Sequence, residues 1–280
     1  MTANAASKTL VIAVQYGRGD KTTKMTESIR RASRPTIVEL VVVDNGYYDF
    51  PGERQHFESM GTGEHEIQII QSQNAGYFGG ANLGLTKFQT DQHSWVIISN
   101  NDIQFAPDFF ERLANGNYPP NCIVVPRIIG SDGIDQNPQY TTPIPLHKRC
   151  AFALLFLLPA RLGWPLFNFL GRAFGQRGIA GRPTQLSQPA VVWIPLGAIF
   201  VIPSSTMQRL QQMPDESFLY GEEMLLKRNL SAIGGEFIMD PNLTVHHDES
   251  STTSSLGGLA SWKFKRAAFF HYWRFYLLGF

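Results

Sequence analysis

Cysteine is scarce in this sequence, and an uninterrupted long apolar run is absent. Only Cys122 and Cys150 occur among 280 residues, too few for a fold built on disulfides, so we expect two reduced thiols. The first residues, MTANAASKTLVIAV, lack the long apolar core of a signal peptide, and their end is typical of a strand. We therefore expect a cytoplasmic protein.

An excess of charge of one sign is also missing. Lys and Arg together number 24, Asp and Glu number 23, and the formal net charge is +1. The absence of a basic excess argues against a nucleic-acid partner, and no acidic tail is present. With 43% hydrophobic residues, the composition is that of one large globular domain, or of one domain with an appendage.

The most apolar stretch begins with AFALLFLL at Ala151–Leu158 and continues to Leu170. A membrane-spanning helix needs about 20 mostly apolar residues, and Pro159, Arg161 and Pro165 interrupt this stretch, so we exclude one. Two interpretations stay open: buried core, or a surface that dips into a bilayer interface. The same two interpretations stay open for the C-terminal segment WKFKRAAFFHYWRFYLLGF. Its mixture of cations and aromatics suits a membrane interface, but cationic side chains can also lie along an apolar core. The protein could therefore be peripheral on the cytosolic face of a membrane.

Strand-like and helix-like segments alternate through the first half of the chain. The run Thr36–Val43 is too continuously apolar for a half-exposed strand, which indicates burial on both faces. The alternation predicts an α/β fold with a mostly parallel sheet and right-handed crossovers. We expect strands at 10–15, 36–43, 66–70, 95–98, 122–125, 236–239 and 243–245, and helices ending near 32 and at 81–88 and 107–114.

Three polar clusters directly follow apolar runs of this kind. They are Gln15-Tyr16, Asp44-Asn45 and Asn100-Asn101-Asp102. Each alone could be a plain turn, because Asn and Asp bond readily to nearby backbone groups. In open α/β sheets, however, ligands bind outside the carboxyl ends of the strands. Three clusters at one edge therefore predict a binding site.

A glycine-rich segment, QNAGYFGGANLGL, lies between the second and third clusters. Gly76, Gly79 and Gly80 permit positive φ and a close approach of backbone to a ligand. Their spacing fits neither a Walker loop nor GxGxxG. A phosphate-cradling loop and a glycine-rich turn before a helix both remain open on these residues alone.

Six short motifs occur in a definite order: VVVDNG, NAGYFGGANLGL, ISNNDI, WIPLGAIFVI, DESFLYGEEMLLKRN and VHHDESS. In this order they resemble the large inverting glycosyltransferase family (family two) with the GT-A fold, and most closely its bacterial rhamnosyltransferase-like members. The resemblance implies a Rossmann-like, mostly parallel sheet flanked by helices, with a smaller mixed acceptor-side part. It also implies a nucleotide-sugar-binding half at 1–130, an insertion with the apolar segment at 131–190, and an acceptor and catalytic half at 191–280.

The resemblance implies a metal site for Mn²⁺ or Mg²⁺. Transfer from a nucleoside diphosphate sugar has to neutralise the departing diphosphate, and a divalent cation with oxygen ligands does so. Asp102 would be a ligand, and His247 would contribute to the metal and diphosphate site. Asn100 stands where the family has its first carboxylate, so this chain brings one formal charge rather than two.

The resemblance also implies a donor site for a dTDP- or UDP-linked sugar. Asp44 would accept hydrogen bonds from the nucleoside, and Asn74 and Asn82 would bond nucleotide or sugar hydroxyls. Two alternatives stay open: Asp-Asn-Gly is a good turn triplet by itself, and Asn82 could be an ordinary polar position on the following helix. The other residues expected in this site are Gln15, Tyr16, Gly76, Gly79, Gly80, Asn100 and Asn101.

Inversion by direct displacement needs a general base for the acceptor hydroxyl, and a carboxylate suits that role. The resemblance places Glu223 at the family's aspartate base, with Glu222 positioning the acceptor. Glutamate is one methylene longer, so Glu222 could take the role instead, and acidic residues also favour a helix N-terminus for structural reasons. Trp193, Gly197 and Ala198 are expected on the acceptor side, although plain core suits Trp193 nearly as well.

We therefore expect a metal-dependent inverting glycosyltransferase that moves a sugar to a glycan or lipid-linked acceptor in cell-envelope polysaccharide synthesis. Rhamnose is suggested by the resemblance only. A non-catalytic nucleotide-sugar or glycan-binding protein on the same scaffold is one alternative, because Asn100 and Glu223 depart from the family motifs. A sugar nucleotidyltransferase is a weaker one, because GRGDK at 17–21 faintly imitates the glycine-rich basic loop of those enzymes.

Overall fold

The computed structural model describes residues 8–16, 19–32, 36–46, 67–89, 92–174, 186–248 and 258–279. Two pieces of the motifs named above fall outside these ranges. Gly17 and Arg18 belong to the segment compared with nucleotidyltransferase loops, and residues 249–251 end the VHHDESS motif.

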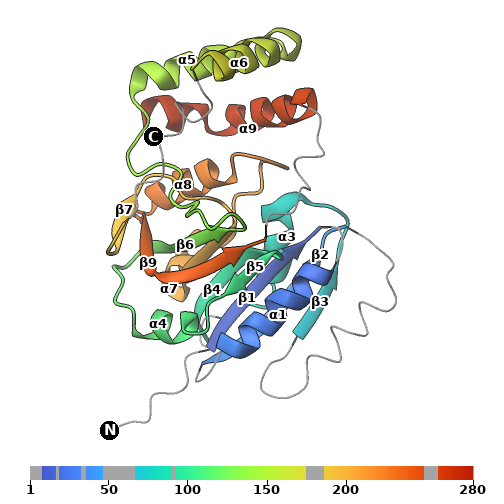
Figure 1. Ribbon diagram of the computed structural model, residues 1–280, viewed down its shortest axis with the longest axis vertical. Coiled ribbons are helices and arrows are strands. Elements are labelled where there is room, and N and C mark those ends of the chain that lie inside the picture. Colours follow the sequence, from blue (N-terminus) through green and yellow to red (C-terminus); the bar gives the residue numbers. More distant parts are fainter. Residues whose placement is uncertain are drawn as a thin grey trace.

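In the described part of the chain, nine strands form one sheet in the order β3-β2-β1-β4-β8-β6-β9-β5, with β7 paired to β9 (Figure 1). Strands β1 to β4 are parallel, whereas β8 runs antiparallel to its neighbours β4 and β6. The expected α/β fold, parallel in its first half and mixed in its second, is confirmed. The strands are β1 Lys8–Gln15, β2 Ile37–Asp44, β3 Ile67–Gln71, β4 His93–Asn100, β5 Ile103–Phe105, β6 Cys122–Gly130, β7 Ala190–Val192, β8 Ile199–Pro203 and β9 Glu236–His247.

Alternation along the strands gives the sheet two buried faces. In β1, Val11 and Ala13 belong to one apolar cluster, and Leu10, Ile12 and Val14 belong to the other. Successive side chains of a strand point to opposite sides, so each strand contributes to both clusters. A sheet buried on both faces explains why its central strands are almost continuously apolar.

Helices cover both faces, and three further helices lie apart (Figure 1). Helices α1 and α4 contribute to the first cluster, and α3, α7 and α8 contribute to the second. At one end of the molecule α5, α6 and α9 pack on one another, and α9 also packs on α8. The helices are α1 Asp20–Ala32, α3 Gly76–Leu85, α4 Phe109–Asn115, α5 Leu146–Leu157, α6 Ala160–Phe174, α7 Ser204–Leu210, α8 Glu222–Ala232 and α9 Gly258–Leu278.

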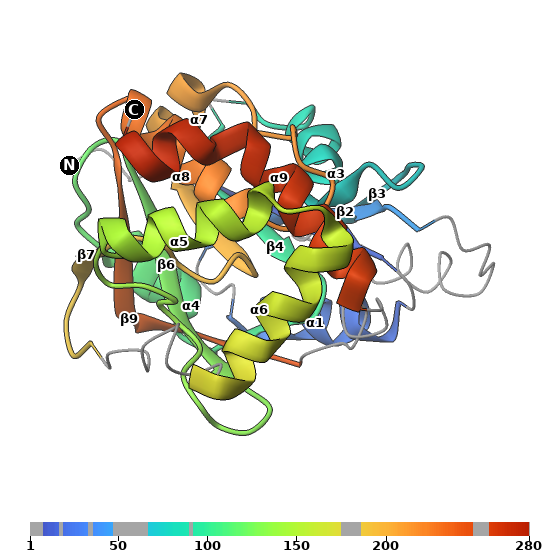
Figure 2. The same ribbon diagram turned by 90° about the horizontal axis from the view of Figure 1, so that it is seen from above.

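The longest apolar stretch forms two helices, because α5 ends at Leu157 and α6 begins at Ala160, with Pro159 between them. We call α5, α6 and α9 the helical layer. Figure 2 looks onto it and shows the three helices beside one another at this end of the molecule. Among the described residues no helix has both the length and the apolar character needed to cross a membrane.

Helix α3 begins at Gly76, whereas the sequence predicted a start at Ala81. Of the two interpretations left open, a glycine-rich turn before the helix is wrong, because Gly76, Gly79 and Gly80 lie within the helix itself. They allow close packing: a Cβ at Gly84 would lie 2.4 Å from Ile12 Cγ2, and one at Gly76 would lie 2.5 Å from the Phe218 carbonyl oxygen. Gly76 also has a φ of 77°, which other residues rarely adopt.

Strand β9 was expected as two separate strands and is a single one, Glu236–His247. Its pairing with β6 passes from Asp240 to Thr244 with a shift of register. Pro241 lies within that shift, where a residue without an N–H costs no ladder hydrogen bond. The proline therefore interrupts the pattern in the sequence without ending the strand.

Candidate active site

The polar strand ends lie side by side, as the sequence predicted. Gln15 is in register with Asp44, and Val14 is in register with Asn100, so β1, β2 and β4 end at the same edge. Gln15 and Asp44 are buried, whereas the Tyr16 side chain is 48% exposed. This edge is therefore open on the side of Tyr16.

Asp102 and His247 meet at this edge although they are distant in sequence. Asp102 lies in the turn between β4 and β5, and β5 pairs antiparallel with the end of β9, which places Ile103 opposite His247. His247 Nε2 is 3.3 Å from Asp102 Oδ1, and both side chains are largely buried. The Asp248 N–H donates to the Asp102 carbonyl at 2.9 Å, which extends the pairing by one residue.

Gln136 fixes the orientation of the His247 ring. Gln136 Oε1 lies 3.0 Å from His247 Nδ1 and can accept a hydrogen from it; in that tautomer the lone pair of Nε2 faces the Asp102 carboxylate. A lone pair facing a carboxylate is favourable only with a cation between them, either a proton or a metal ion. Adjacent ligands of an octahedral Mg²⁺, each about 2.1 Å from the ion, are about 3 Å apart. Asp102 and His247 therefore fit a divalent cation.

Lys21 brings a positive charge to the same edge, and the sequence analysis did not identify it as part of the site. Its Nζ is 4.0 Å from Asp102 Oδ2 and donates to the Asp248 carbonyl. Lys24 pairs with the Asp248 carboxylate at 3.4 Å. Among the described residues no group of three or more His, Cys, Asp or Glu side chains is placed to hold a metal ion. Asp102 and His247 would thus leave other coordination positions to a ligand.

Hydrogen bonds to two asparagines hold the surrounding loops. Asn101 Nδ2 donates to Thr22 Oγ1 at 2.9 Å, and that hydroxyl donates to Gln15 Oε1 at 2.6 Å. Asn74 Oδ1 accepts from the Gly76 N–H at 3.1 Å at the start of α3. These predicted donor-site residues therefore stabilise the edge itself, and this contribution needs no ligand.

Asn82 bonds entirely within the fold. Its Oδ1 accepts from the Met213 N–H at 2.8 Å, and its Nδ2 donates to the Met213 carbonyl at 3.0 Å and to Asp215 at 3.3 Å. These bonds tie α3 to the segment before α8. The bonds of Asn82 favour the interpretation that it is an ordinary polar position on the helix and does not contact a nucleotide. Gly79 and Gly80 also lie inside α3, where Gly80 packs on β1.

The Asp44 carboxylate accepts the hydrogen bond that is expected within an Asp-Asn-Gly turn. Its Oδ1 accepts from the Gly46 N–H at 3.3 Å. Burial raises the pKa of Asp44, and hydrogen bonds from Gly46 and Gln15 partly offset that rise. A buried carboxylate with so few internal donors is stabilised further by any donor that a ligand brings.

Glu222 and Glu223 form the first turn of α8, directly after Gly221. Gly197 N–H donates to Glu223 Oε1 at 3.0 Å, and a Cβ at Gly197 would lie 2.6 Å from that oxygen, so a larger residue does not fit. Burial raises the pKa of Glu223; burial and then the charge of Glu223 raise the pKa of Glu222 to about 8. The two carboxyls lose their protons in separate steps. Ala198, predicted beside them, is buried in the core.

Tyr77 belongs to the site and was missed from the sequence. Its hydroxyl is buried and has no hydrogen-bond partner in the described part of the chain. Burial raises the pKa of Tyr77, and the charges of Glu222, Glu223 and Asp102 raise it further. Next to Tyr77, a Cβ at Gly76 would lie 2.5 Å from the Phe218 carbonyl oxygen, so the start of α3 packs on the segment that leads to Glu222 and Glu223. The position of Tyr77 inside the glycine-rich motif was the only signal in the sequence.

Aromatic side chains close the site toward α9. A Cβ at Gly221 would lie 2.8 Å from the Tyr272 ring, and burial together with nearby tyrosine and glutamate charges raises the pKa of Tyr272. Trp193 is half-buried, with its ring centroid 5.9 Å from that of Tyr140 and 6.5 Å from that of Tyr276. Trp193 is thus part of an aromatic cluster that borders the acceptor side proposed for it.

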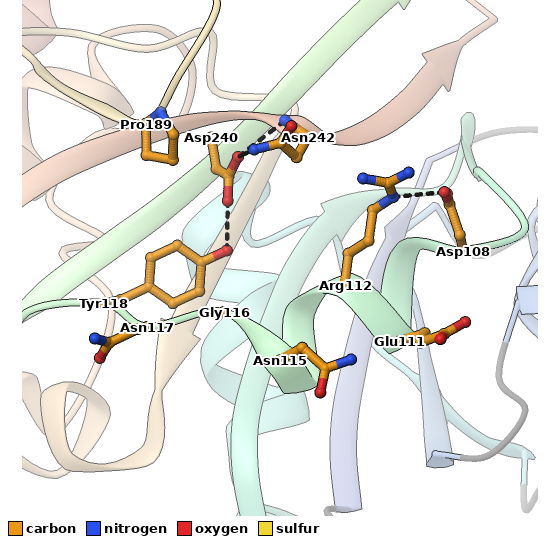
Figure 3. Close-up of a pocket in the computed structure, with 10 residues that line it drawn as sticks. All are labelled: Asp108, Glu111, Arg112, Asn115, Gly116, Asn117, Tyr118, Pro189, Asp240 and Asn242. Atoms are coloured by element: carbon orange, nitrogen blue, oxygen red, sulfur yellow. Dashed lines mark hydrogen bonds and ion pairs between the residues drawn. The ribbon is translucent and has the colours of Figure 1, made fainter.

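A pocket of about 460 Å³ lies elsewhere in the molecule (Figure 3). The Tyr118 hydroxyl donates to Asp240 at 2.7 Å, and Asn242 donates to the same carboxylate from its backbone and its side chain. The charge of Asp240 is thus stabilised within the fold. Asp240 lies in the first half of β9 and His247 ends that strand, so this pocket is remote from the candidate active site.

Residues 10–172, more than half of the chain, match the family model described as glycosyl transferase family 2. The chain belongs to glycosyl transferase family 2. The match includes the three polar strand ends and Asp102, whereas Glu222, Glu223 and His247 lie beyond it. No curated protein matches the sequence.

Several solved structures share the fold of this family 2 chain at low identity. GalNAc-T7 with UDP, GalNAc and Mn²⁺ has a TM-score of 0.60 and 14% identity, over 88% of this chain and 44% of that one. The mannosyltransferase PcManGT from Pyrobaculum calidifontis, in complex with GDP-Man and Mn²⁺, has a TM-score of 0.54 and 14% identity, over 89% of this chain and 59% of that one. S. aureus TarS 1-349 has a TM-score of 0.53 and 10% identity, over 86% of this chain and 60% of that one. The chain thus spans less than two thirds of each, and the likeness shows the GT-A fold alone.

Glu222→Gln is expected to make the folded protein less sensitive to alkaline pH. The pKa of Glu222 rises from 4.5 to about 8 on folding. The unfolded state therefore ionises first, and the free energy of unfolding falls between these pH values by on the order of a few kcal/mol. The melting temperature of Glu222→Gln should fall less than that of wild type between about pH 5 and pH 8. Glu111→Gln, an exposed control, should show the same fall in melting temperature as wild type. Equal falls in wild type, Glu222→Gln and Glu111→Gln would contradict the raised pKa of Glu222.

Tyr77→Phe is expected to raise the free energy of unfolding by up to about 1 kcal/mol, because it removes a buried hydroxyl without a partner. Tyr118→Phe is the matched control, since that hydroxyl donates to Asp240. Its loss should lower the free energy of unfolding by about 1–3 kcal/mol. Urea denaturation measures both changes, and a destabilised Tyr77→Phe would show that the Tyr77 hydroxyl is hydrogen-bonded.

Proposed function

We propose that this chain is a metal-dependent inverting glycosyltransferase that moves a sugar from a nucleoside diphosphate to a glycan or lipid-linked acceptor. The 3.3 Å approach of His247 to Asp102, at the edge where the strand-end polar residues gather, is the observation that carries the proposal. Membership of glycosyl transferase family 2 supports the reaction class. The start of α3 packs on the segment before the Glu222–Glu223 pair, at Gly76 and Phe218, which supports a place for the pair in the same site.

Asp102 and His247 would hold Mn²⁺ or Mg²⁺. The bound ion supplies positive charge against the diphosphate as it leaves. The structures of GalNAc-T7 with UDP and of PcManGT with GDP-Man both contain Mn²⁺, which supports Mn²⁺ for this chain. Lys21, 4.0 Å from Asp102, would add a second positive charge toward the phosphates.

The nucleotide would lie along the carboxyl ends of β1 and β2. Asp44 is buried there with few internal donors, so it would accept hydrogen bonds from the nucleoside. The exposed ring of Tyr16 offers an apolar surface next to it. Asn100 would contribute an amide oxygen near the phosphates. In this arrangement residues 1–130 bind the donor, and residues 191–280 form the acceptor and catalytic side.

Glu223 would act as the general base. It takes the proton of the acceptor hydroxyl while that oxygen attacks the anomeric carbon from the face opposite the diphosphate, which inverts the configuration. Its raised pKa makes it a stronger base near neutral pH. Glu222, with a pKa of about 8, keeps its proton at neutral pH and can donate a hydrogen bond to the acceptor.

Rhamnose from a dTDP donor is proposed from the motif resemblance alone, with cell-envelope polysaccharide synthesis as its setting. The similar structures were obtained with UDP and with GDP-Man, so dTDP, UDP and GDP donors all belong in a test.

A nucleoside diphosphate with Mn²⁺ is expected to raise the melting temperature on the order of 5 °C at a hundredfold excess over Kd, and to do little without the metal. Asp102→Asn should abolish the metal-dependent part, because it removes the carboxylate while keeping its shape. The exposed Glu111→Gln variant should respond as wild type does. Full metal-dependent stabilisation of Asp102→Asn by UDP, GDP and dTDP would contradict the proposed cation site.

Glu223→Gln is expected to lower kcat about 10²–10⁴-fold, because the amide cannot take a proton. It keeps the Oε1 that accepts from Gly197, so its melting temperature should not fall below that of wild type, and its nucleotide response should remain close to wild type. Release of nucleoside diphosphate from a panel of sugar donors measures turnover. A wild type that binds nucleotide without turnover would support a non-catalytic binding protein, and loss in Glu222→Gln alone would move the base to Glu222.

A further inference from the structure

Helix α6 exposes large apolar side chains to solvent, although Arg161 is exposed on it as well. Gly163 packs against Trp262 of α9, and the Phe167 ring lies 5.2 Å from the same indole. The opposite side of α6 carries Leu162 and Phe169, whose side chains are 62% and 67% exposed. A surface helix normally turns its polar side to solvent, and α6 departs from this at Leu162 and Phe169.

The apolar exposure continues over the rest of the helical layer. Half or more of the side chain is exposed at Leu154 and Leu157 of α5 and at Leu278 of α9. The three helices pack on one another, and exposed apolar side chains that gather in one part of a surface are typical of a site of contact. The large exposed apolar residues of the layer are Leu146, Leu154, Leu157, Leu162, Leu166, Phe169, Leu259, Phe270, Trp273 and Leu278.

Charge in the helical layer is of one sign. None of the three helices contains Asp or Glu. Lys148, Arg161, Lys263 and Arg274 are exposed beside the apolar side chains. Arg274 lies 5.4 Å from the centroid of the Trp273 ring, so cation and aromatic are presented together.

We propose that the exposed face of the helical layer docks on the surface of a bilayer that contains anionic lipid. Apolar side chains would enter the boundary between headgroups and acyl chains, while Lys and Arg meet the lipid phosphates. A second copy of the chain fits poorly, because two such faces would bring cations together without a carboxylate to pair with them. The charge of this face therefore favours a partner surface that is both anionic and apolar.

Docking of this face would place the candidate active site near the bilayer. Helix α9 touches the segment before the glutamate pair directly: a Cβ at Gly221 would lie 2.8 Å from the Tyr272 ring and 3.1 Å from Ala268 Cβ. This step rests on the proposed function, in which Glu223 activates an acceptor hydroxyl. It favours a lipid-linked acceptor, whose reacting end stays close to the headgroups, over a free glycan.

Co-sedimentation with vesicles tests the docking without reference to catalysis. The full chain is mixed with vesicles of phosphatidylcholine alone or of phosphatidylcholine with phosphatidylglycerol. Wild type should sediment with the anionic vesicles and much less with the neutral ones. Lys263→Glu/Arg274→Glu should weaken binding more than tenfold by removing two cations and adding two anions. Leu162→Glu/Phe169→Glu should abolish it, and Ile134→Glu, at an equally exposed site outside the layer (57%), should bind as wild type does.

Several outcomes would overturn the docking. It is wrong if wild type binds neither vesicle, if the charge variant binds as well as wild type, or if light scattering shows a dimer that the Leu162→Glu/Phe169→Glu variant loses. Melting temperatures confirm that each variant is folded. If Leu162→Glu/Phe169→Glu unfolds, Lys263→Glu/Arg274→Glu still decides the test, because both of its positions are exposed. The nucleotide response is measured in parallel. Lost vesicle binding with an intact nucleotide response refutes docking alone, whereas the reverse result refutes the proposed function alone.

Discussion

The antiparallel pairing of β5 with the end of β9 is the contact on which the geometry of the site depends. It places Ile103 opposite His247 and so brings the imidazole to the Asp102 carboxylate. Asp102 belongs to the parallel half of the sheet, whereas His247 ends the last strand of the mixed half. A short strand of three residues, Ile103–Phe105, thus brings polar side chains of the two halves together. Gln136 then fixes the ring, so that Nε2 rather than Nδ1 faces the carboxylate.

A second constraint is the burial of like charges on α8. Burial raises the pKa values of Glu222 and Glu223, and the charge of Glu223 raises that of Glu222 further, which means that the fold holds the two carboxylates at a cost in stability. The Gly197 N–H stabilises the Glu223 carboxylate and leaves no space there for a side chain. Groups with strongly shifted pKa values concentrate at functional sites, and the charges of these two also raise the pKa of Tyr77, whose hydroxyl has no hydrogen-bond partner among the described residues. Unfavourable electrostatics are therefore concentrated at the site, and the two apolar clusters of the sheet stabilise it.

The sequence was sufficient for the parallel half of the fold and for the edge at which the polar strand ends meet. Apolar runs that end in polar clusters predicted level strand ends, because parallel strands share one carboxyl edge. Periodicity could not show that Asp102 and His247 meet; that prediction came from the motif resemblance, because the β5–β9 pairing is long-range. The helix α3 was predicted to begin too late, since helix propensity disfavours the glycines that its packing on β1 requires. Tyr77 was missed because the direction of its hydroxyl depends on packing, and the apolar runs of the helical layer could not be divided into core and surface without the structure.

The charges around Asp102 suggest how donor and cation would depend on each other. Asp102 is the one carboxylate at the end of β4, since Asn100 is neutral, and Lys21 lies 4.0 Å from it. Asp248 is already paired with Lys21 and Lys24. A divalent cation would therefore meet little net negative charge on the protein itself, and binding sites for Mg²⁺ or Mn²⁺ usually complete their shell with substrate phosphates. In the proposed function the diphosphate supplies the missing charge, so that cation and nucleotide would bind together more tightly than either binds alone. The same lysines that weaken the site for a free cation would strengthen it for the phosphate-bound one.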